Sequence, residues 1–309
     1  MASNVQINRW YELTIGDGKT FEAVVITPPI GLSFSVEKSS TALRKQNTGQ
    51  IEVYNLPEST LKVLQGDYPV AFLKVGYEKG DVITILKGEV ISVDTRKQGT
   101  DKVTQILIGS GYVEINHKVV KAVIPEGKSV KEVITTLQTE MTGISKGVYS
   151  GFNIHKKVLY GYPMNGTPRE TLDNLARTYH LDYQIDNDTL YVHDADGTTD
   201  ENYALAPVID ETSGLIDLPY DTKVNVGKAK KSIDNKAGVH FKILLNPTLQ
   251  AGSIVRIESE TITGWFKISD LKHYGGNRQN DWYTECKCES KSKVDEAQLE
   301  DVENGDSVA

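Results

Sequence analysis

The chain has 309 residues, of which 39% are hydrophobic and 25% are charged, and its formal net charge at pH 7 is -8. This length can bury a sizeable core and predicts two or three domains, since domains usually hold about 100 to 200 residues. The acidic balance argues against a nucleic-acid-binding protein, because contacts with phosphates require a clustered basic surface.

The sequence shows neither a secretory signal nor a membrane span. Its first ten residues, MASNVQINRW, lack a charged segment followed by an apolar one. No apolar stretch approaches the roughly 20 residues that a membrane-spanning helix requires. We therefore expect a soluble protein that is synthesised in a cytoplasm and makes no stable membrane insertion.

Residues 11 to 112 are predicted to form β-strands almost throughout. Seven segments combine β-branched and aromatic residues, several of them in alternation: 13–15, 34–36, 51–54, 71–75, 82–86, 89–93 and 105–108. Turn residues such as Lys79-Gly80-Asp81 separate them. One short helix is expected at 55–64, where Pro57 and Glu58 stand early and Gly66 follows. The sequence predicts an antiparallel sheet that is curled or barrel-like.

The pattern changes to helical spacing after Pro125. Ser129 and Glu132 form a capping box at the start of SVKEVITTLQTEM, whose apolar residues repeat at helical intervals. Thr167 and Glu170 form a second capping box at the start of TPRETLDNLARTYH. Two short strand segments follow, at 181–185 and 190–192, and predict a hairpin with its turn at 186–188.

Strand patterning returns from Gly214 to Glu289. Pro247 predicts a corner between strands at 241–245 and 254–257, because proline cannot donate a hydrogen bond to a sheet. Cys286 and Cys288 alternate along one strand, where they are poorly placed for a disulfide and lack the further ligands of a zinc site. We expect both to be buried free thiols.

These patterns predict a mainly β fold with an α/β insert. The expected units are an N-terminal β-barrel at 1–113, the α/β insert at 114–200, a second β-barrel at 201–289, and a disordered acidic tail at 290–309. The tail is assigned as disordered because it has few apolar side chains to bury.

Two motifs suggest chemistry, but neither is specific. Gly109-Ser110-Gly111 contains the small residues of a phosphate-binding loop, but it lacks a third glycine, and residues 115–120 are predicted to be extended. His193, Asp194 and Asp196 present an imidazole and two carboxylates, yet Asp-x-Asp-Gly after a strand is typical of a solvated turn. Neither the six histidines nor any serine or cysteine shows the spacing of a metal site or a catalytic triad. The sequence therefore predicts no catalytic residue, no cofactor and no metal.

Three stretches resemble one protein family in their arrangement. In Ser33 to Val93, a strand ending in Lys-Ser precedes a second strand, an Asn-Leu-Pro turn and a short helix. The second stretch is Gly166 to Val192, and the third runs from Ser213 to Glu289 and contains the Leu-Leu-Asn-Pro corner. Over about Trp10 to Glu289 the chain resembles the baseplate hub proteins of contractile-tailed phages (myoviruses), which are related to the late control D proteins and to the hub part of type VI secretion spikes.

The resemblance implies a fold, a role and a set of partners. In that family a homotrimer forms a pseudo-sixfold ring, to which each subunit contributes two tail-tube-like β-barrels. The ring joins the tail tube to the central spike and leaves a channel for DNA, and a net negative wall would let phosphates pass without binding. The implied partners are the tail-tube or tube-initiator proteins, the spike protein and, as a further candidate, the tape measure protein, with no sequence-specific nucleic acid. The implied location is the tail baseplate of the virion, after synthesis in the bacterial host cytoplasm.

The resemblance also indicates an interaction segment. Residues 37–50 correspond to the long connection that reaches a neighbouring ring in that family, and Lys38, Arg44 and Lys45 make this segment basic. These cations would meet carboxylates on the next component. A solvated loop explains the same charges equally well, since exposed charges usually contribute little.

Two other functions stay open. A tail-associated cell-wall hydrolase is one, because a pair of catalytic carboxylates meets in space and not in sequence, although the chain has no spare domain for it. The other is a β-barrel module that binds carbohydrate or single-stranded nucleic acid, which requires exposed aromatic residues beside basic ones. Trp265, Trp282, Tyr183 and Tyr191 lie in predicted strands and are expected to be core or interface anchors.

Overall fold

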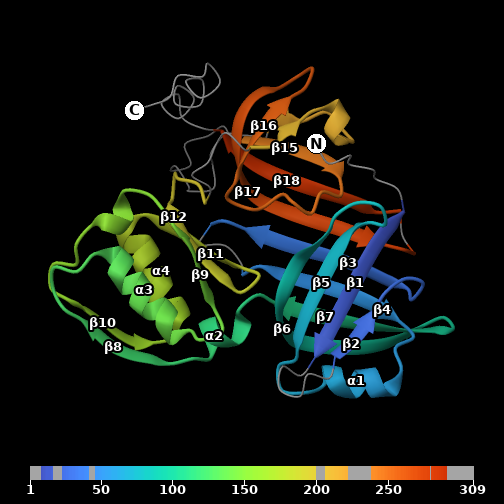
Figure 1. Ribbon diagram of the computed structural model, residues 1–309, viewed down its shortest axis with the longest axis horizontal. Helices are drawn as coiled ribbons and strands as arrows, with labels where there is room; N and C mark the ends of the chain where they lie inside the picture. Colours follow the sequence, from blue (N-terminus) through green and yellow to red (C-terminus); the bar gives the residue numbers. More distant parts are fainter. Residues whose placement is uncertain are drawn as a thin grey trace, which may run out of the picture.

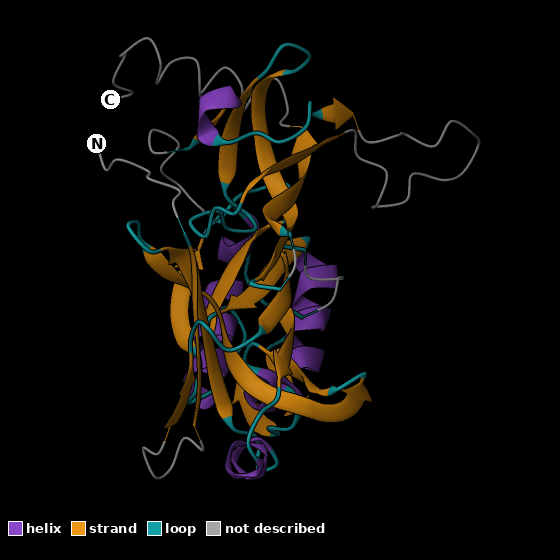
Figure 2. Ribbon diagram, turned by 90° about the vertical axis from the view of Figure 1, so that its right-hand side faces the viewer, coloured by secondary structure: helices purple, strands orange, loops and turns teal. Residues whose placement is uncertain are grey.

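A computed structural model describes residues 8–16, 23–41, 46–199, 206–221, 238–278 and 280–290 (Figure 1). Thirteen strands form one sheet, and a smaller unit of helices and short strands lies beside it. This arrangement confirms the predicted fold class, mainly β with an α/β insert. Figure 2 shows that the large sheet extends as a curved layer along the molecule.

The N-terminal part supplies seven strands and one helix. They are β1 (Arg9–Gly16), β2 (Ala23–Ile26), β3 (Leu32–Ser39), β4 (Thr48–Tyr54), α1 (Glu58–Leu64), β5 (Val70–Tyr77), β6 (Val82–Gln98) and β7 (Asp101–Gly109). The short helix predicted after the Asn-Leu-Pro turn is confirmed as α1. The segments 82–86 and 89–93, predicted as separate strands, belong to the single long strand β6.

The C-terminal part adds six strands to the same sheet. They are β13 (Val208–Ile209), β14 (Tyr220–Asp221), β15 (Gly238–Leu244), β16 (Ile254–Glu258), β17 (Thr263–Gly276) and β18 (Trp282–Ser290), with a 3-10 turn η3 at Glu211–Ser213. β17 pairs with β3 over seven residues, from Asp270 with Ser39 to Gly276 with Ser33. The two β regions are therefore joined edge to edge.

The hydrophobic cores show how closely these parts are joined. One core consists of side chains between Tyr11 and Ile108 together with Leu245 and Trp282 from the C-terminal part. The insert has its own core, and a third core lies between Ile209 and Cys288. Trp282 is 3% exposed and packs edge-on against Phe34, with ring centroids 5.7 Å apart, so it is the core anchor that the sequence predicted.

The insert contains three helices and five strands. They are α2 (Tyr112–Asn116), β8 (Val120–Ile124), α3 (Val130–Glu140), β9 (Ser145–Tyr149), the 3-10 turn η1 (Asn153–His155), β10 (Tyr162–Gly166), α4 (Pro168–Tyr179), β11 (Leu181–Asp186) and β12 (Thr189–Asp194). β8 pairs with β10, and β11, β12 and β9 form a second small sheet. In Figure 1 the helices α3 and α4 lie between these two sheets.

Both predicted capping boxes are confirmed. The Ser129 hydroxyl accepts a hydrogen bond from the Glu132 backbone N–H, and the Glu132 carboxylate accepts one from the Ser129 backbone N–H. Thr167 and Glu170 make the same reciprocal pair at the start of α4. The predicted hairpin is also present as β11 and β12. Asn187 in its turn has a φ of 49°, as a tight two-residue turn requires.

One local prediction was wrong. Residues 115–120 were expected to be extended, but the helix α2 occupies Tyr112–Asn116, and β8 begins only at Val120. Gly111, with a φ of 61°, turns the chain before this helix, and the Glu89 carboxylate accepts the backbone N–H of Tyr112 at 2.7 Å. Side chains distant in sequence thus fix a turn that the local pattern did not indicate.

The two cysteines are free and buried, as predicted. Burial raises the pKa of both thiols, so at pH 8 they are protonated and unreactive. We expect a thiol-specific disulfide reagent to modify neither Cys286 nor Cys288 in the native protein at pH 8. The same reagent should modify both in denaturant, as measured by absorbance of the released thiolate. Rapid labelling of the native protein would contradict this burial.

No helix in the described parts of the chain is long and apolar enough to cross a membrane. Of the predicted acidic tail, residues 291–309 lie outside the described ranges. The proposed division into four units stays a prediction.

Candidate interaction surface

The outer face of the joined sheet carries charged side chains in rows that cross several strands. Alternation puts Glu37 of β3, Lys272 of β17, Glu285 of β18 and Lys242 of β15 on this face, and cross-strand pairing aligns them in one row. A second row aligns His240, Lys287, Asp270 and Ser39. We call the face formed by these two rows the charged face. Its charges alternate in sign from strand to strand, which is the favourable arrangement for cross-strand neighbours.

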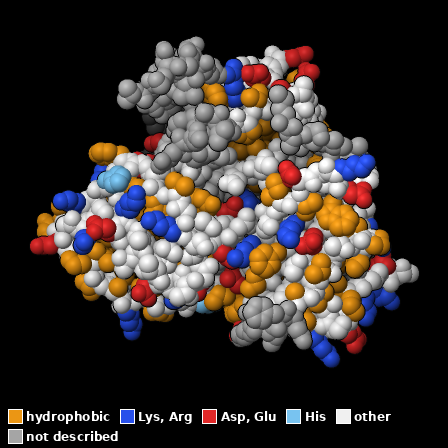
Figure 3. All heavy atoms as spheres, viewed as in Figure 1, with side chains coloured by type: hydrophobic (Ala, Val, Ile, Leu, Met, Phe, Trp, Pro, Cys, Tyr) orange, Lys and Arg blue, Asp and Glu red, His pale blue; other side chains and the backbone are white. Residues whose placement is uncertain are grey.

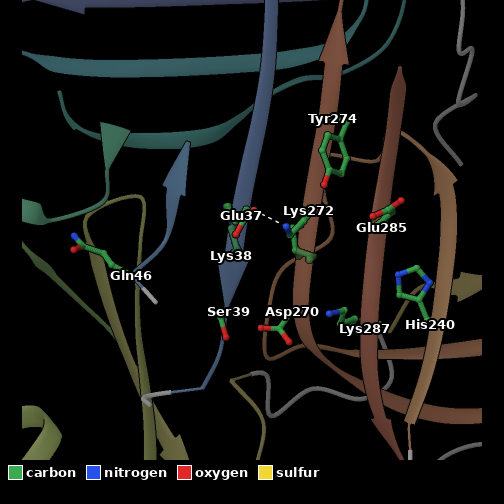
Figure 4. A pocket seen from close by; sticks show the side chains of 11 residues that line it. Glu37, Lys38, Ser39, Gln46, His240, Asp270, Lys272, Tyr274, Glu285 and Lys287 are labelled. Carbon is green, nitrogen blue, oxygen red and sulfur yellow. Dashed lines mark hydrogen bonds and ion pairs between the residues drawn. The ribbon is translucent and has the colours of Figure 1, made fainter. Parts of the chain in front are cut away.

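The charged face is hollowed beside the insert. A hollow of about 500 Å³ is lined by both rows, except for Lys242, and on the insert side by Gln46. Figure 4 shows the ammonium group of Lys272 turned toward the Glu37 carboxylate, with which it forms an ion pair. His240 lies farther along the sheet, and its ring is 4.9 Å from that of Tyr220. Burial lowers the pKa of His240, so its ring is neutral at pH 7.

The charged face is balanced and not strongly acidic. Its two rows hold three carboxylates and three ammonium groups: Glu37, Asp270 and Glu285 against Lys242, Lys272 and Lys287. Lys242 also lies over the ring of Tyr283, with its Nζ atom 3.7 Å from the centroid. Such a surface is hydrated and polar but presents little net charge to a polyanion or a polycation.

Lys38, the first predicted interaction residue, lies on the opposite face of β3. It is 5% exposed, and its Nζ atom is 2.7 Å and 2.9 Å from the two carboxylate oxygens of Asp186 in the insert. The cation is therefore already paired inside the chain. Arg44 and Lys45, the other two predicted residues, lie outside the described residues.

The turn between β11 and β12 joins the insert to the sheet. Asp188 in this turn accepts a hydrogen bond from the backbone N–H of Gly111 at 3.2 Å and is 3.1 Å from the ammonium of Lys87. Asn47 donates its side-chain amide to the backbone oxygen of Ile185 at 3.0 Å. Together with the Lys38 pair, these contacts place the tip of a hairpin between β3, β6 and the start of α2. We call this contact region the hairpin junction.

The predicted connection at 37–50 is shorter than expected. β3 continues to Ser39 and β4 begins at Thr48, so the connecting segment is 40–47. The prediction that this segment contacts a neighbouring ring stays untested.

The charged face was not predicted, although the sequence contained a signal for it. Asp270 and Lys272, and likewise Glu285 and Lys287, are two residues apart on strands, which places each pair on one face.

Asp194 of the possible metal motif has a structural role. The Asp194 carboxylate accepts backbone hydrogen bonds from Phe152 at 2.8 Å and Asn153 at 3.0 Å, and the Asp194 backbone oxygen accepts one from Gly197. These bonds close a turn at the end of β12. This agrees with the turn interpretation of the motif.

Comparison with known proteins identifies the family. A model of the family described as baseplate hub gp41 matches residues 12–288. The chain belongs to this baseplate hub family. It is therefore a structural protein of the phage tail baseplate, and the resemblance seen in the sequence is confirmed. No curated protein sequence matches the chain.

Solved structures share the fold of this hub family member at low sequence identity. A tail protein from Neisseria meningitidis MC58 is 8% identical, with a TM-score of 0.62, covering 91% of this chain and 96% of that one. The 43 kDa tail protein of prophage MuSo2 from Shewanella oneidensis is also 8% identical, with a TM-score of 0.62 and coverages of 90% and 96%. The E. coli c3393 protein, described as a type VI secretion component similar in structure to T4 tail proteins gp27 and gp5, is 7% identical. Its TM-score is 0.57, with coverages of 86% and 75%.

Proposed function

We propose that three copies of this chain form a pseudo-sixfold ring that joins the tail tube to the central spike and leaves a channel for DNA. Membership of the baseplate hub family is the observation that carries this proposal. The joined sheet supports it, because two β regions of one chain in one continuous sheet let a trimer present six similar wall segments. The ring acts by geometry and carries out no catalysis.

The two ends of the large sheet are the surfaces through which neighbouring copies would meet. β2 and β14 are the terminal strands of the sheet order. Each exposes a large apolar side chain, Val25 at 54% and Tyr220 at 56%. Open apolar edges promote uncontrolled pairing unless a neighbour covers them. An interface between two different edges is heterologous and closes into a ring when its rotation permits.

The charged face is our candidate for the channel wall. Its alternating carboxylates and ammonium groups leave little net charge, so phosphates would meet neither a strong attraction nor a strong barrier. This refines the expectation of a net negative wall. Contacts with the tail-tube or tube-initiator proteins, the spike and the tape measure protein belong to the rims of the ring. Arg44 and Lys45 are proposed to contact one of these neighbours.

Light scattering over a concentration series tests the ring. We expect a mass near three times 34.2 kDa for the intact chain. Val25→Lys should shift the mass toward that of the monomer, because a lysine at the edge of β2 disfavours pairing between strands. Val148→Lys, at a side chain of similar exposure on β9 of the insert, is the matched control and should keep the trimer. A monomer at every concentration, with or without tube and spike proteins, would contradict the ring.

Neither alternative function receives specific support. The aromatic anchors Trp282 and Tyr183 are buried, and Trp265 lies under the guanidinium of Arg256. A carbohydrate or single-stranded nucleic-acid platform requires such rings to be free for stacking.

A further inference from the structure

Several large apolar side chains of the insert are exposed, and three of them lie on β8 and in the loop before β10. Val123 on β8 is 75% exposed, and Leu159 and Tyr160, in the loop that leads into β10, are 73% and 94% exposed. Val123 pairs with Pro163 of β10, and both point away from the insert core. We call Val123, Leu159, Tyr160 and Pro163 the insert patch. Soluble proteins rarely leave such a group of apolar side chains uncovered without a binding role.

Lysines border the insert patch. Lys121 lies two residues before Val123 on the same face of β8, and Lys156 and Lys157 are separated from Leu159 by the buried Val158. All three are exposed, and none of them forms an ion pair within the described residues. Figure 3 shows apolar and basic side chains side by side on the insert. An occupant should therefore combine apolar side chains with negative charge.

One segment of the same chain has this composition. Residues 294–309 hold six carboxylate side chains and no lysine or arginine, namely Asp295, Glu296, Glu300, Asp301, Glu303 and Asp306. Val294, Leu299 and Val302 alternate with these acids. We propose that this C-terminal acidic segment binds the insert patch, with its carboxylates on the three lysines and its aliphatic residues on Val123, Leu159 and Tyr160.

The end of the described chain lies on the side of the sheet that meets the insert. Cys288 near the end of β18 pairs with Ile268, whose backbone oxygen accepts a hydrogen bond from Gly252. Gly252 in turn accepts one from the backbone N–H of Thr199, just after the insert. The segment 291–309 would span roughly 60 Å when extended, since each residue adds about 3.3 Å. This length lets the segment extend far from the end of β18, so the patch could be occupied by the chain's own segment or by that of a neighbouring copy.

An anionic membrane is a less suitable occupant. Three lysines would attract an anionic surface only weakly, while the net charge of -8 would repel the same surface.

Hydrogen exchange measured by mass spectrometry tests the proposal. We compare the full chain with a chain that ends at Ser290, and expect the amides of 119–124 and 157–165 to exchange several-fold more slowly in the full chain. A synthetic peptide of residues 291–309 added to the shortened chain should restore the protection. Protection that increases with protein concentration would indicate a neighbour's segment, and constant protection would indicate the chain's own segment. Both support the proposal.

Variants separate this binding from general effects on the fold. Two variants should remove the protection. One carries Tyr160→Ser, and the other combines Lys121→Glu, Lys156→Glu and Lys157→Glu. Leu218→Ser, at a similarly apolar residue that is 55% exposed in the C-terminal part, should not remove the protection. A peptide with its six acids replaced by the corresponding amides should fail to protect.

Equal exchange in the long and short chains, or no effect of the peptide, would overturn the proposal. If vesicles of phosphatidylglycerol protect the same segments and the peptide does not, the patch binds an anionic membrane and the proposal is wrong. The trimeric ring is tested by the mass in solution and the binding of the acidic segment by hydrogen exchange. The two proposals can therefore fail independently.

Discussion

Replacing Lys38 with methionine is expected to lower the free energy of unfolding by about 3 to 5 kcal/mol. The ammonium of Lys38 is the partner of Asp186, and both side chains are almost fully removed from water. Methionine leaves the Asp186 carboxylate buried without its counter-ion, which is costly because a low-dielectric surrounding disfavours an isolated charge. Urea denaturation of the wild type and the variant measures the loss.

Two further variants identify the cause of this loss. Lys272→Met removes a lysine from a pair with Glu37 that is exposed on the charged face, and should cost about 1 kcal/mol or less. Lys38→Met combined with Asp186→Leu removes both buried charges and should recover most of the stability. If the double variant is no more stable than Lys38→Met, the loss comes from packing and not from the unpaired carboxylate.

The second large effect is a loss of stability in acid that comes from His273. This side chain is fully buried on β17, with its Nδ1 atom 2.9 Å from the Thr284 hydroxyl oxygen. Burial, with a smaller contribution from Lys38, lowers its pKa to about 3. In the unfolded chain a histidine has a pKa of about 6.5, so below pH 6.5 the unfolded state binds the additional proton. The stability that the neutral ring provides is therefore complete above pH 6.5 and declines as the pH falls toward 3.

The decline should be about 1.4 kcal/mol per pH unit, or about 2 kcal/mol between pH 6.5 and pH 5. Because other groups also titrate, the measurement is the difference between the wild type and His273→Gln, whose amide does not titrate. From pH 7 to pH 5 the wild type should lose about 2 kcal/mol more than the variant. The same replacement at exposed His155 is the control. Equal losses in the wild type and His273→Gln would show that the folded protein accepts the proton without cost.

The features that the sequence predicted depend on neighbours along the chain. The capping boxes at Ser129 and Thr167 join residues that are three positions apart. The alternation around Cys286 relates residues that are two positions apart. The helix α2 was missed because its cause is distant: the Glu89 carboxylate, on a strand of the N-terminal part, accepts the N–H of Tyr112. Local sequence patterns therefore predicted an element correctly where hydrogen bonds between nearby residues determine its ends.

The candidate surfaces were harder to predict, because they depend on which strands become neighbours. Lys38 was assigned to an exposed basic loop, since nothing near it in the sequence indicates a buried partner. Its partner Asp186 belongs to a hairpin tip in the insert. The charged face likewise exists only because β17 pairs with β3, a contact between the two β regions that periodicity does not specify. The family resemblance indicated the role of the chain without indicating these contacts.

The pairing of β3 with β17 also has a consequence for how the protein is made. Glu37 and Lys272, which meet across these strands, are separated by 235 residues. A ribosome adds about 5 to 20 residues per second, so β3 waits on the order of 10 to 50 s for its partner strand to be synthesised. During this interval its edge is open to other nascent chains. Slow translation between these strands should therefore lower the yield of soluble protein, and a chaperone that covers open edges should restore it.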